Sequence, residues 1–255
     1  MKVKILNIDT LYVNEIINIL NCDGICKVSN DKKITPNDFL NFCKKFLLIT
    51  PLTKNDPDII KVSKNTTFST YDLPWHQEGS HYENNIISVT YNYKNCEKFP
   101  TEFINTNTIV KEFCNDLDYY DRIEITLKDW GRVKRKKENS EEWGWFWSNK
   151  NIPLKSRSRI KVLTKSNDKF YLFINPKYTD EILNDDDNHY FNLIKKFDSR
   201  EQNIEKFKLI SNIKSNEILI YDNSKIIHTR PKNIKNFDFD RELWRITGIL
   251  MEKSF

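Results

Sequence analysis

The sequence predicts an α+β fold with a mainly antiparallel β-core and helices outside it. Two segments with apolar residues at helical spacing lie near the start of the chain, and short strand-like runs joined by polar turns follow from about residue 59 onward. The chain has 255 residues without an internal repeat or a low-complexity linker, so we expect one domain over 1–255. Aromatic residues make up 13% of it, which supplies large side chains for a core.

The first elements are predicted from apolar spacing and capping residues. Residues 11–20 carry apolar side chains at helical spacing, and 25–28 alternate like a strand after a turn at Gly24. A second helix is expected within 34–48, because Thr35 can cap it and Pro36 suits its first turn. The apolar face of this helix is expected to extend to Phe46 and Leu47. Both helices should pack on a sheet.

The remaining segments are mostly strand-like. The predicted strands are 59–63, 85–93, 101–106, 122–127, 159–164, 169–175, 217–223 and 243–250. Helical spacing returns only at 190–197, before the last two of these strands. So many strands joined by polar turns indicate a sandwich or a barrel.

Residues 128–158 have no clear period. They hold a basic run at 132–137 and four aromatic residues within 143–147, including Trp145 and Trp147. A long segment of this kind is typical of a lid or insertion over a site, and we expect Trp145 and Trp147 to be the aromatics that touch a substrate. The alternative is an insertion that packs its own aromatic residues on the core.

Charge and cysteine content exclude several classes of protein. The net charge of +5 comes from 41 basic and 36 acidic residues mixed along the chain, which is typical of a solvated surface. Five cysteines without a C-x-x-C pair predict neither a disulfide framework nor a zinc ribbon, and they fit a reducing cytoplasm. No window approaches the roughly 18 apolar residues of a membrane span, so we expect a cytoplasmic protein without a membrane partner.

Two His-x-Glu pairs lie near each other, at His76 and Glu78 and at His81 and Glu83. In an extended segment, residues two apart project to the same side, so either pair can offer an imidazole nitrogen and a carboxylate oxygen to one metal ion. Either pair alone is a weak signal. We interpret His81 and Glu83 as groups that face substrate, support the site or lie at the surface, with a ligand role as the alternative.

The third metal ligand is expected near the end of the chain. The predicted strand 217–223 ends at Asp222 and Asn223, and His228 follows. Two histidines and one carboxylate on one face of a metal leave three positions open, which is the arrangement of non-haem iron(II) oxygenases.

Four motifs in this order resemble the taurine dioxygenase-like superfamily of iron(II)/2-oxoglutarate oxygenases. LPWHQEG is similar to its first metal motif, and FPTEFINT to the strand whose Thr helps to hold 2-oxoglutarate. SNEILIYDNSKIIHTR resembles its second metal motif, and RELWR its closing Arg-x-x-x-Arg. GICKV and ITPNDFLNFCKKF are similar to its opening strand and helix. The resemblance covers most of the chain and implies a double-stranded β-helix, the jelly-roll or cupin-like core, with flanking helices.

The resemblance also implies site residues and cofactors. It makes His76, Glu78 and His228 the ligands of Fe(II), with 2-oxoglutarate and O2 as co-substrates. Arg241 would pair with the distal carboxylate of 2-oxoglutarate beside Thr101. Arg245 would lie near the other end of 2-oxoglutarate or near the substrate. A planar guanidinium suits one carboxylate of this dicarboxylate, while its keto-acid end chelates the metal.

Departures from the family pattern bear on the substrate. Lys98, Phe99 and Pro100 replace the usual Gly-Gly-Asp before the co-substrate Thr, and Ser215 and Asn216 replace the Gly of a Gly-Asp turn. The metal carboxylate is Glu78 where many members have Asp, which resembles the clavaminate synthase-like branch acting on amino acids. We therefore expect hydroxylation of an unactivated C–H bond in a small, polar, amino acid-like molecule, with release of succinate and CO2.

Other functions stay open on the sequence alone. The altered glycines fit a β-fold binding protein that has lost catalysis. The basic run 132–137 beside tryptophans fits a binding module or an oxygenase that acts on nucleic acid, although the mixed charges disfavour such a partner. His189 is expected at the surface at the start of a helix, and Arg230 can be structural. The sequence does not indicate an oligomeric state.

Overall fold

The computed structural model describes residues 4–8, 12–50, 60–62, 75–79, 85–94, 101–127, 159–176, 178–211, 213–229 and 242–251. Its helices are α1 (Val13–Cys22), α2 (Pro36–Lys44), α3 (Thr106–Phe113), α4 (Leu117–Arg122), α7 (His189–Ser199) and α8 (Gln202–Glu205). Its strands are β1 (Lys4–Asn7), β2 (Ile25–Ser29), β3 (Leu47–Thr50), β4 (Ile60–Val62), β5 (Ile87–Lys94), β6 (Glu102–Asn105), β7 (Glu124–Leu127), β8 (Arg159–Lys161), β9 (Leu163–Ser166), β10 (Lys169–Leu172), β11 (Thr179–Leu183), β12 (Leu209–Ile210), β13 (Ile218–Asp222), β14 (Ile226–Thr229) and β15 (Glu242–Leu250).

The largest sheet has the strand order β1-β2-β13-β5-β15-β3, and β4 also pairs with β15. Every strand pair in it is antiparallel except β1 with β2. A second sheet has the order β12-β6-β14 and is antiparallel throughout. Among the described residues the predicted combination of helices with mainly antiparallel strands is therefore confirmed.

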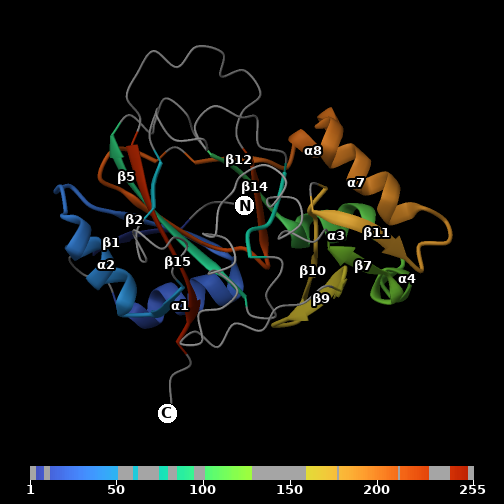
Figure 1. The fold of residues 1–255 in the computed structure, drawn as a ribbon, viewed down its shortest axis with the longest axis horizontal. Coiled ribbons are helices and arrows are strands. Elements are labelled where there is room, and N and C mark those ends of the chain that lie inside the picture. Colours follow the sequence, from blue (N-terminus) through green and yellow to red (C-terminus); the bar gives the residue numbers. More distant parts are fainter. Residues whose placement is uncertain are drawn as a thin grey trace, which may run out of the picture.

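Helices α1 and α2 cover one face of the large sheet, at the opposite end of the molecule from α3, α4 and α7 (Figure 1). Their buried side chains join Val89 of β5, Ile220 of β13 and Ile246 of β15 in one apolar cluster. The predicted capping of α2 is confirmed, because the Thr35 side chain accepts a hydrogen bond from the Asp38 N–H and the Asp38 carboxylate accepts one from the Thr35 N–H.

The other face of the large sheet meets the second sheet. A small apolar cluster joins Leu219 and Tyr221 of β13 to Phe103 of β6 and Ile226 of β14. Side chains alternate along a strand, so the neighbours Ile218 and Ile220 of β13 point to the helix-covered face. The space between the two sheets is where His228, on the same strand as Ile226, projects.

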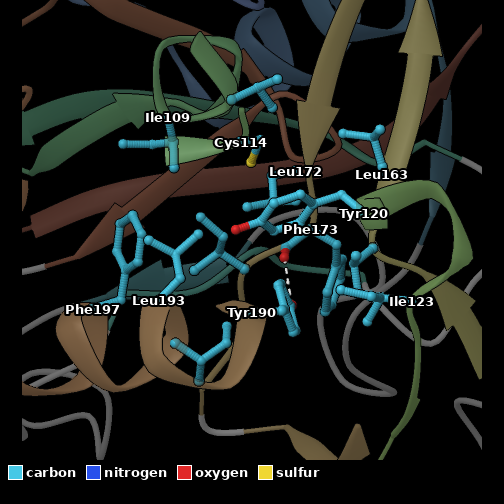
Figure 2. Close-up of a cluster of buried hydrophobic side chains, with 14 of the residues drawn as sticks. Ile109, Cys114, Tyr120, Ile123, Leu163, Leu172, Phe173, Tyr190, Leu193 and Phe197 are labelled. Carbon is cyan, nitrogen blue, oxygen red and sulfur yellow. Dashed lines mark hydrogen bonds between the residues drawn. The ribbon is translucent and has the colours of Figure 1, made fainter. Parts of the chain in front are cut away.

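A third cluster covers the outer face of the second sheet. Ile104 of β6 and Ile227 of β14 join side chains from α3, α4 and α7. Figure 2 shows part of this cluster, including Ile109 of α3, Tyr120 of α4 and Leu193 of α7. Within this cluster the fully buried Tyr190 of α7 donates its hydroxyl to the Phe173 carbonyl at 2.6 Å. This packing fixes α7 and the residues that follow β10 against the strand that carries His228.

Several boundaries differ from the sequence prediction. The helix expected within 34–48 ends at Lys44, because Leu47 starts β3 and pairs with Leu250 of β15. The single strand expected at 159–164 is two strands, since Val162 breaks the run by bonding to Ile123 and Phe173. His189 is the exposed first residue of α7, as expected. The segment 128–158 lies outside the described residues.

Some elements were not predicted. They include β14, α3, α4 and β11. For α3, the β-branched Thr106, Ile109 and Val110 favour a strand by propensity, yet the Asn105 side chain caps the Asn107 N–H and begins a helix there. No described helix has the length and apolar character needed to span a bilayer.

Candidate metal centre

His76 and His228 are held side by side by backbone hydrogen bonds. The His76 N–H donates to the His228 carbonyl at 3.1 Å, and the His228 N–H donates to the His76 carbonyl at 3.0 Å. This isolated antiparallel bridge places the imidazole centroids 4.2 Å apart, and both side chains are buried. Two residues 152 positions apart in sequence thus face one point between the sheets.

Gln77 anchors the segment between the two ligand candidates. Its side-chain oxygen accepts from the Ile174 N–H at 2.8 Å, and its amide donates to the Ser224 carbonyl at 3.3 Å. The Asn175 amide donates to the Gln77 carbonyl at 3.0 Å. Because Gln77 points away from the imidazoles, these bonds fix its neighbours with their side chains on the other side.

Residues on either side of this segment also restrict it. Trp75 is fully buried, packs edge-on against Phe197 and donates its indole N–H to Glu205 at 3.4 Å. Gly79 has φ +70°, and a Cβ there would lie 2.3 Å from Ile86. Only glycine fits this turn, so the chain can leave the site immediately after Glu78.

The two oxygens of Glu78 have different surroundings. Oε2 accepts a hydrogen bond from the Ser88 hydroxyl of β5 at 3.1 Å. Oε1 lies 3.9 Å from Nε2 of His228 and accepts from Nη1 of Arg245 on β15. The Glu78 N–H donates to Oδ1 of Asn223 at 3.3 Å, which ties the backbone to the turn between β13 and β14.

His76, Glu78 and His228 each offer a ligand atom, and these atoms lie within 4.8 Å of one another. Two imidazole nitrogens and one carboxylate oxygen suit a divalent non-haem iron, and their approach from one side leaves the other side open. Burial raises the pKa of Glu78, but Arg245, the two imidazoles and the Ser88 hydroxyl outweigh it and lower the pKa to about 2. The carboxylate is therefore ionised and ready to bind a cation.

Aromatic side chains surround His228. The ring of Tyr221 lies 5.2 Å from it and that of Phe103 lies 6.1 Å from it. Burial and the nearby Glu78 carboxylate raise the pKa values of Tyr178 and Tyr221, so both hydroxyls stay protonated at neutral pH. These groups make the surroundings of the candidate site apolar with two hydroxyl donors.

Of the three residues expected to bind 2-oxoglutarate, the structure describes Arg245 and Thr101. Arg245 contacts Glu78. Thr101 precedes β6, exchanges hydrogen bonds with Ser211, and by alternation shares a face with Phe103, whose ring is close to His228. Arg241 lies outside the described residues, as do His81, Glu83 and Arg230.

Sequence reasoning did not identify Ser88, Tyr178 or Tyr221 as site residues. Ser88 is one small polar residue in a predicted strand, and its contact with Glu78 depends on how β5 lies beside the 75–79 segment. Asn223 belonged to the motif around His228 but received no role. Its position directly after a buried strand was a signal that could have found it.

Comparison with known proteins gives structural neighbours only. No protein-family model and no curated protein sequence matches the chain. A Burkholderia xenovorans protein assigned as an alpha-ketoglutarate-dependent taurine dioxygenase has a TM-score of 0.66 at 16% identity, over 95% of this chain and 85% of that one. A taurine dioxygenase from the same organism has a TM-score of 0.66 at 14% identity, over 95% and 83%.

A third neighbour is AAD-2 in complex with Mn(II) and N-oxalylglycine, with a TM-score of 0.63 at 13% identity, over 95% of this chain and 88% of that one. At these low identities, the TM-scores show a shared fold. The resemblance found in the sequence motifs is thus confirmed at the level of the fold, since the neighbours include taurine dioxygenases.

Proposed function

We propose that this chain, which shares its fold with taurine dioxygenases, is an iron(II)- and 2-oxoglutarate-dependent dioxygenase. The observation that carries the proposal is the convergence of His76, Glu78 and His228, whose ligand atoms lie within 4.8 Å in that fold. The N-oxalylglycine bound by one neighbour has the two carboxylates and the keto group of 2-oxoglutarate, with N–H in place of a methylene. This supports a keto acid as co-substrate here.

With iron(II), 2-oxoglutarate and O2 bound, such a centre oxidises the keto acid to succinate and CO2 and hydroxylates a C–H bond of the substrate. The residues of the chain would position the metal, the keto acid and the substrate and would shield them from water. His76, Glu78 and His228 hold one side of the metal. Tyr221 and Phe103 keep water from the His228 side.

Three residues are proposed to hold 2-oxoglutarate. Arg241 pairs with its distal carboxylate, and Thr101 donates a hydrogen bond to the same group. Arg245 lies near the end closer to the metal or near the substrate, and its contact with Glu78 supports a place beside the metal ligands. A keto acid held by these residues would leave one metal position for O2 and would be fixed in orientation relative to the substrate.

The proposed substrate is a small, polar, amino acid-like molecule. Glu78 in place of the more usual Asp supports this class through its similarity to the clavaminate synthase-like branch. A screen of amino acids and related compounds that scores succinate above the background without substrate tests it. If none of these compounds raises succinate above that background, the substrate class is wrong, but the proposed reaction is not contradicted.

We further propose that the chain is one domain whose two facing sheets are the halves of a double-stranded β-helix. The antiparallel pairing of the second sheet and of every strand pair in the large sheet except β1 with β2 supports this, as does the cluster between the sheets. Residues 128–158 are proposed to act as a lid. A lid must open for substrate, so its amide hydrogen exchange should slow when metal, 2-oxoglutarate and substrate are added. Slow exchange without ligand would contradict a lid.

The metal assignment is tested by absorption spectroscopy under anaerobic conditions. Wild-type protein with iron(II) and 2-oxoglutarate should show the weak visible charge-transfer band of a chelated keto acid. His76→Ala and His228→Ala should each abolish this band, because each removes one ligand.

Two control variants keep the experiment specific. His81→Ala should retain the band, which separates the two His-x-Glu pairs. His189→Ala should also retain it, since that imidazole is exposed on α7. Retention of the band in both His76→Ala and His228→Ala would contradict the proposed ligands.

A further inference from the structure

We propose that Ser88 and Asn223 are positioning residues that keep Glu78 bound to the metal through one oxygen, Oε1. The inference rests on the proposed metal centre. Neither residue is among the three candidate ligands: Ser88 lies on β5, and Asn223 follows β13. Both are buried, so their hydrogen bonds are not exchanged for bonds to water.

The contacts of Asn223 determine the orientation of its amide. Its oxygen accepts from the Glu78 N–H at 3.3 Å, and a backbone N–H can only donate. Its nitrogen donates to the Ile86 carbonyl at 2.8 Å, and a carbonyl can only accept. The amide nitrogen therefore faces Ser88, and it donates to the Ser88 hydroxyl oxygen at 2.9 Å.

The direction of the Ser88 hydroxyl follows from these contacts. An ionised carboxylate has no hydrogen to give, so Ser88 must be the donor in its 3.1 Å bond to Oε2 of Glu78. Tyr221 also lies within hydrogen-bond reach of Ser88, and it is opposite Ser88 in the strand register. Because Asn223 donates to it, the Ser88 oxygen is the acceptor in that bond, and its single hydrogen is directed to Glu78.

The two oxygens of Glu78 are thereby separated. Oε2 is turned toward β5 and engaged by Ser88. Oε1 is the oxygen nearer the imidazole nitrogen of His228, at 3.9 Å, and the one that meets the cationic Arg245. A metal between the imidazoles therefore meets Oε1.

This separation affects the number of open metal positions. A carboxylate can bind a metal through one oxygen or two. Two imidazoles and one carboxylate oxygen leave three of six positions, which a chelating keto acid and O2 fill. If Glu78 used both oxygens, only two would remain. Ser88 and Asn223 therefore preserve the third position.

The test removes the Ser88 hydroxyl and measures metal and keto acid binding separately. Ser88→Ala should bind iron(II) as tightly as the wild type or more tightly, because the released Oε2 can join the metal. The affinity of the iron-loaded protein for 2-oxoglutarate, from anaerobic titration of the visible band, should fall by about tenfold or more, as for loss of a bond to a charged group. Asn223→Asp, which cannot donate to Ser88, should show the same separation of effects.

Ser29→Ala is the matched control. It also deletes a hydroxyl from the large sheet, where Ser29 donates to the Leu6 carbonyl at 3.0 Å, far in sequence from the site. It should leave both affinities at their wild-type values. If Ser88→Ala keeps the wild-type affinity for 2-oxoglutarate, or loses metal affinity together with thermal stability, the positioning role is wrong.

A crystal structure of the wild-type protein with Mn(II) gives a measurement that needs no variant. It should show Oε1 of Glu78 within ligand distance of the metal and Oε2 hydrogen-bonded to the Ser88 hydroxyl. A metal held by both oxygens would overturn the inference. Wild-type protein that binds no metal and no keto acid would contradict the proposed function itself. If the wild-type protein binds both metal and 2-oxoglutarate and Ser88→Ala binds 2-oxoglutarate with the same affinity, only the positioning role is contradicted.

Discussion

At the scale of single residues, the contacts of Glu78 make the stability of the metal-free protein depend on pH. Burial raises the pKa of this carboxyl, but the opposing charges and the Ser88 bond lower it from 4.5 to about 2. Because the folded state holds its proton less tightly than the unfolded chain, the stabilisation is fully present above the unfolded pKa. It is lost as the pH falls from there toward the folded value.

Urea denaturation of the metal-free protein measures this effect. The free energy of unfolding should be lower at about pH 3 than at about pH 5, and this decrease should be smaller in Glu78→Gln, which cannot titrate. The other carboxyls contribute equally in both proteins. An identical decrease in both would show that Glu78 does not have a lowered pKa.

The two arginines near the end of the chain should differ in their effects. If Arg241 pairs with the distal carboxylate of 2-oxoglutarate as proposed, Arg241→Ala should lower the affinity for the keto acid by roughly 2 to 4 kcal/mol while iron binding survives. Anaerobic isothermal titration of the metal-free protein with iron(II), and of the metal-loaded protein with 2-oxoglutarate, measures both affinities. If Arg245→Ala produces this loss and Arg241→Ala does not, the two arginines are assigned the wrong way round.

At the scale of elements, the N-terminus of α2 shows how local chemistry begins a helix. Thr35 and Asp38 exchange side chain–backbone bonds at 3.2 and 3.0 Å, and Pro36 occupies the first turn. Thr35→Ala should lower the free energy of unfolding by about 1 kcal/mol, since the Asp38 N–H loses its side-chain acceptor and the capping box is broken.

Chemical denaturation of Thr35→Ala beside Asp31→Ala tests the cap. Asp31 is exposed and lies outside the helix, so its replacement should change stability by less than about 0.5 kcal/mol. Equal effects of the two substitutions would mean that the capping box does not stabilise α2 in solution.

At the scale of the whole molecule, the candidate centre joins parts of the chain that no single element holds together. The 75–79 segment, β14, β5 and β15 meet there, so a bound metal and keto acid stabilise the assembled chain and not the unfolded one. Ligands at about 100 times their dissociation constants add about 2.7 kcal/mol of stability. For a chain of this length the melting temperature should rise by roughly 5 to 10 °C.

Thermal unfolding with and without Mn(II) and 2-oxoglutarate measures this rise. His228→Ala should lose most of it, whereas His189→Ala, which removes an exposed imidazole of α7, should keep it. An equal rise in wild type and His228→Ala would indicate binding elsewhere on the protein.

The sequence predicted most strands of the large sheet and the capped start of α2, because these depend on the alternation of side chains and on bonds between neighbouring residues. It did not predict β14, where Ile226, Ile227, His228 and Thr229 are all buried and show no alternation. It extended α2 past Lys44, because apolar spacing alone does not tell a helix face from a buried strand.

The sequence by itself determined the chemical types at the centre: two His residues, one Glu and one Arg, in motifs that pointed to an oxygenase fold. Tertiary structure alone decided that His76 pairs with the backbone of His228, that Oε2 of Glu78 turns to Ser88, and that Arg245 meets Oε1. The reason is distance along the chain. Each of these contacts joins the 75–79 segment to a different strand, β14, β5 or β15, and the register in which these strands pair is not encoded within any one of them alone.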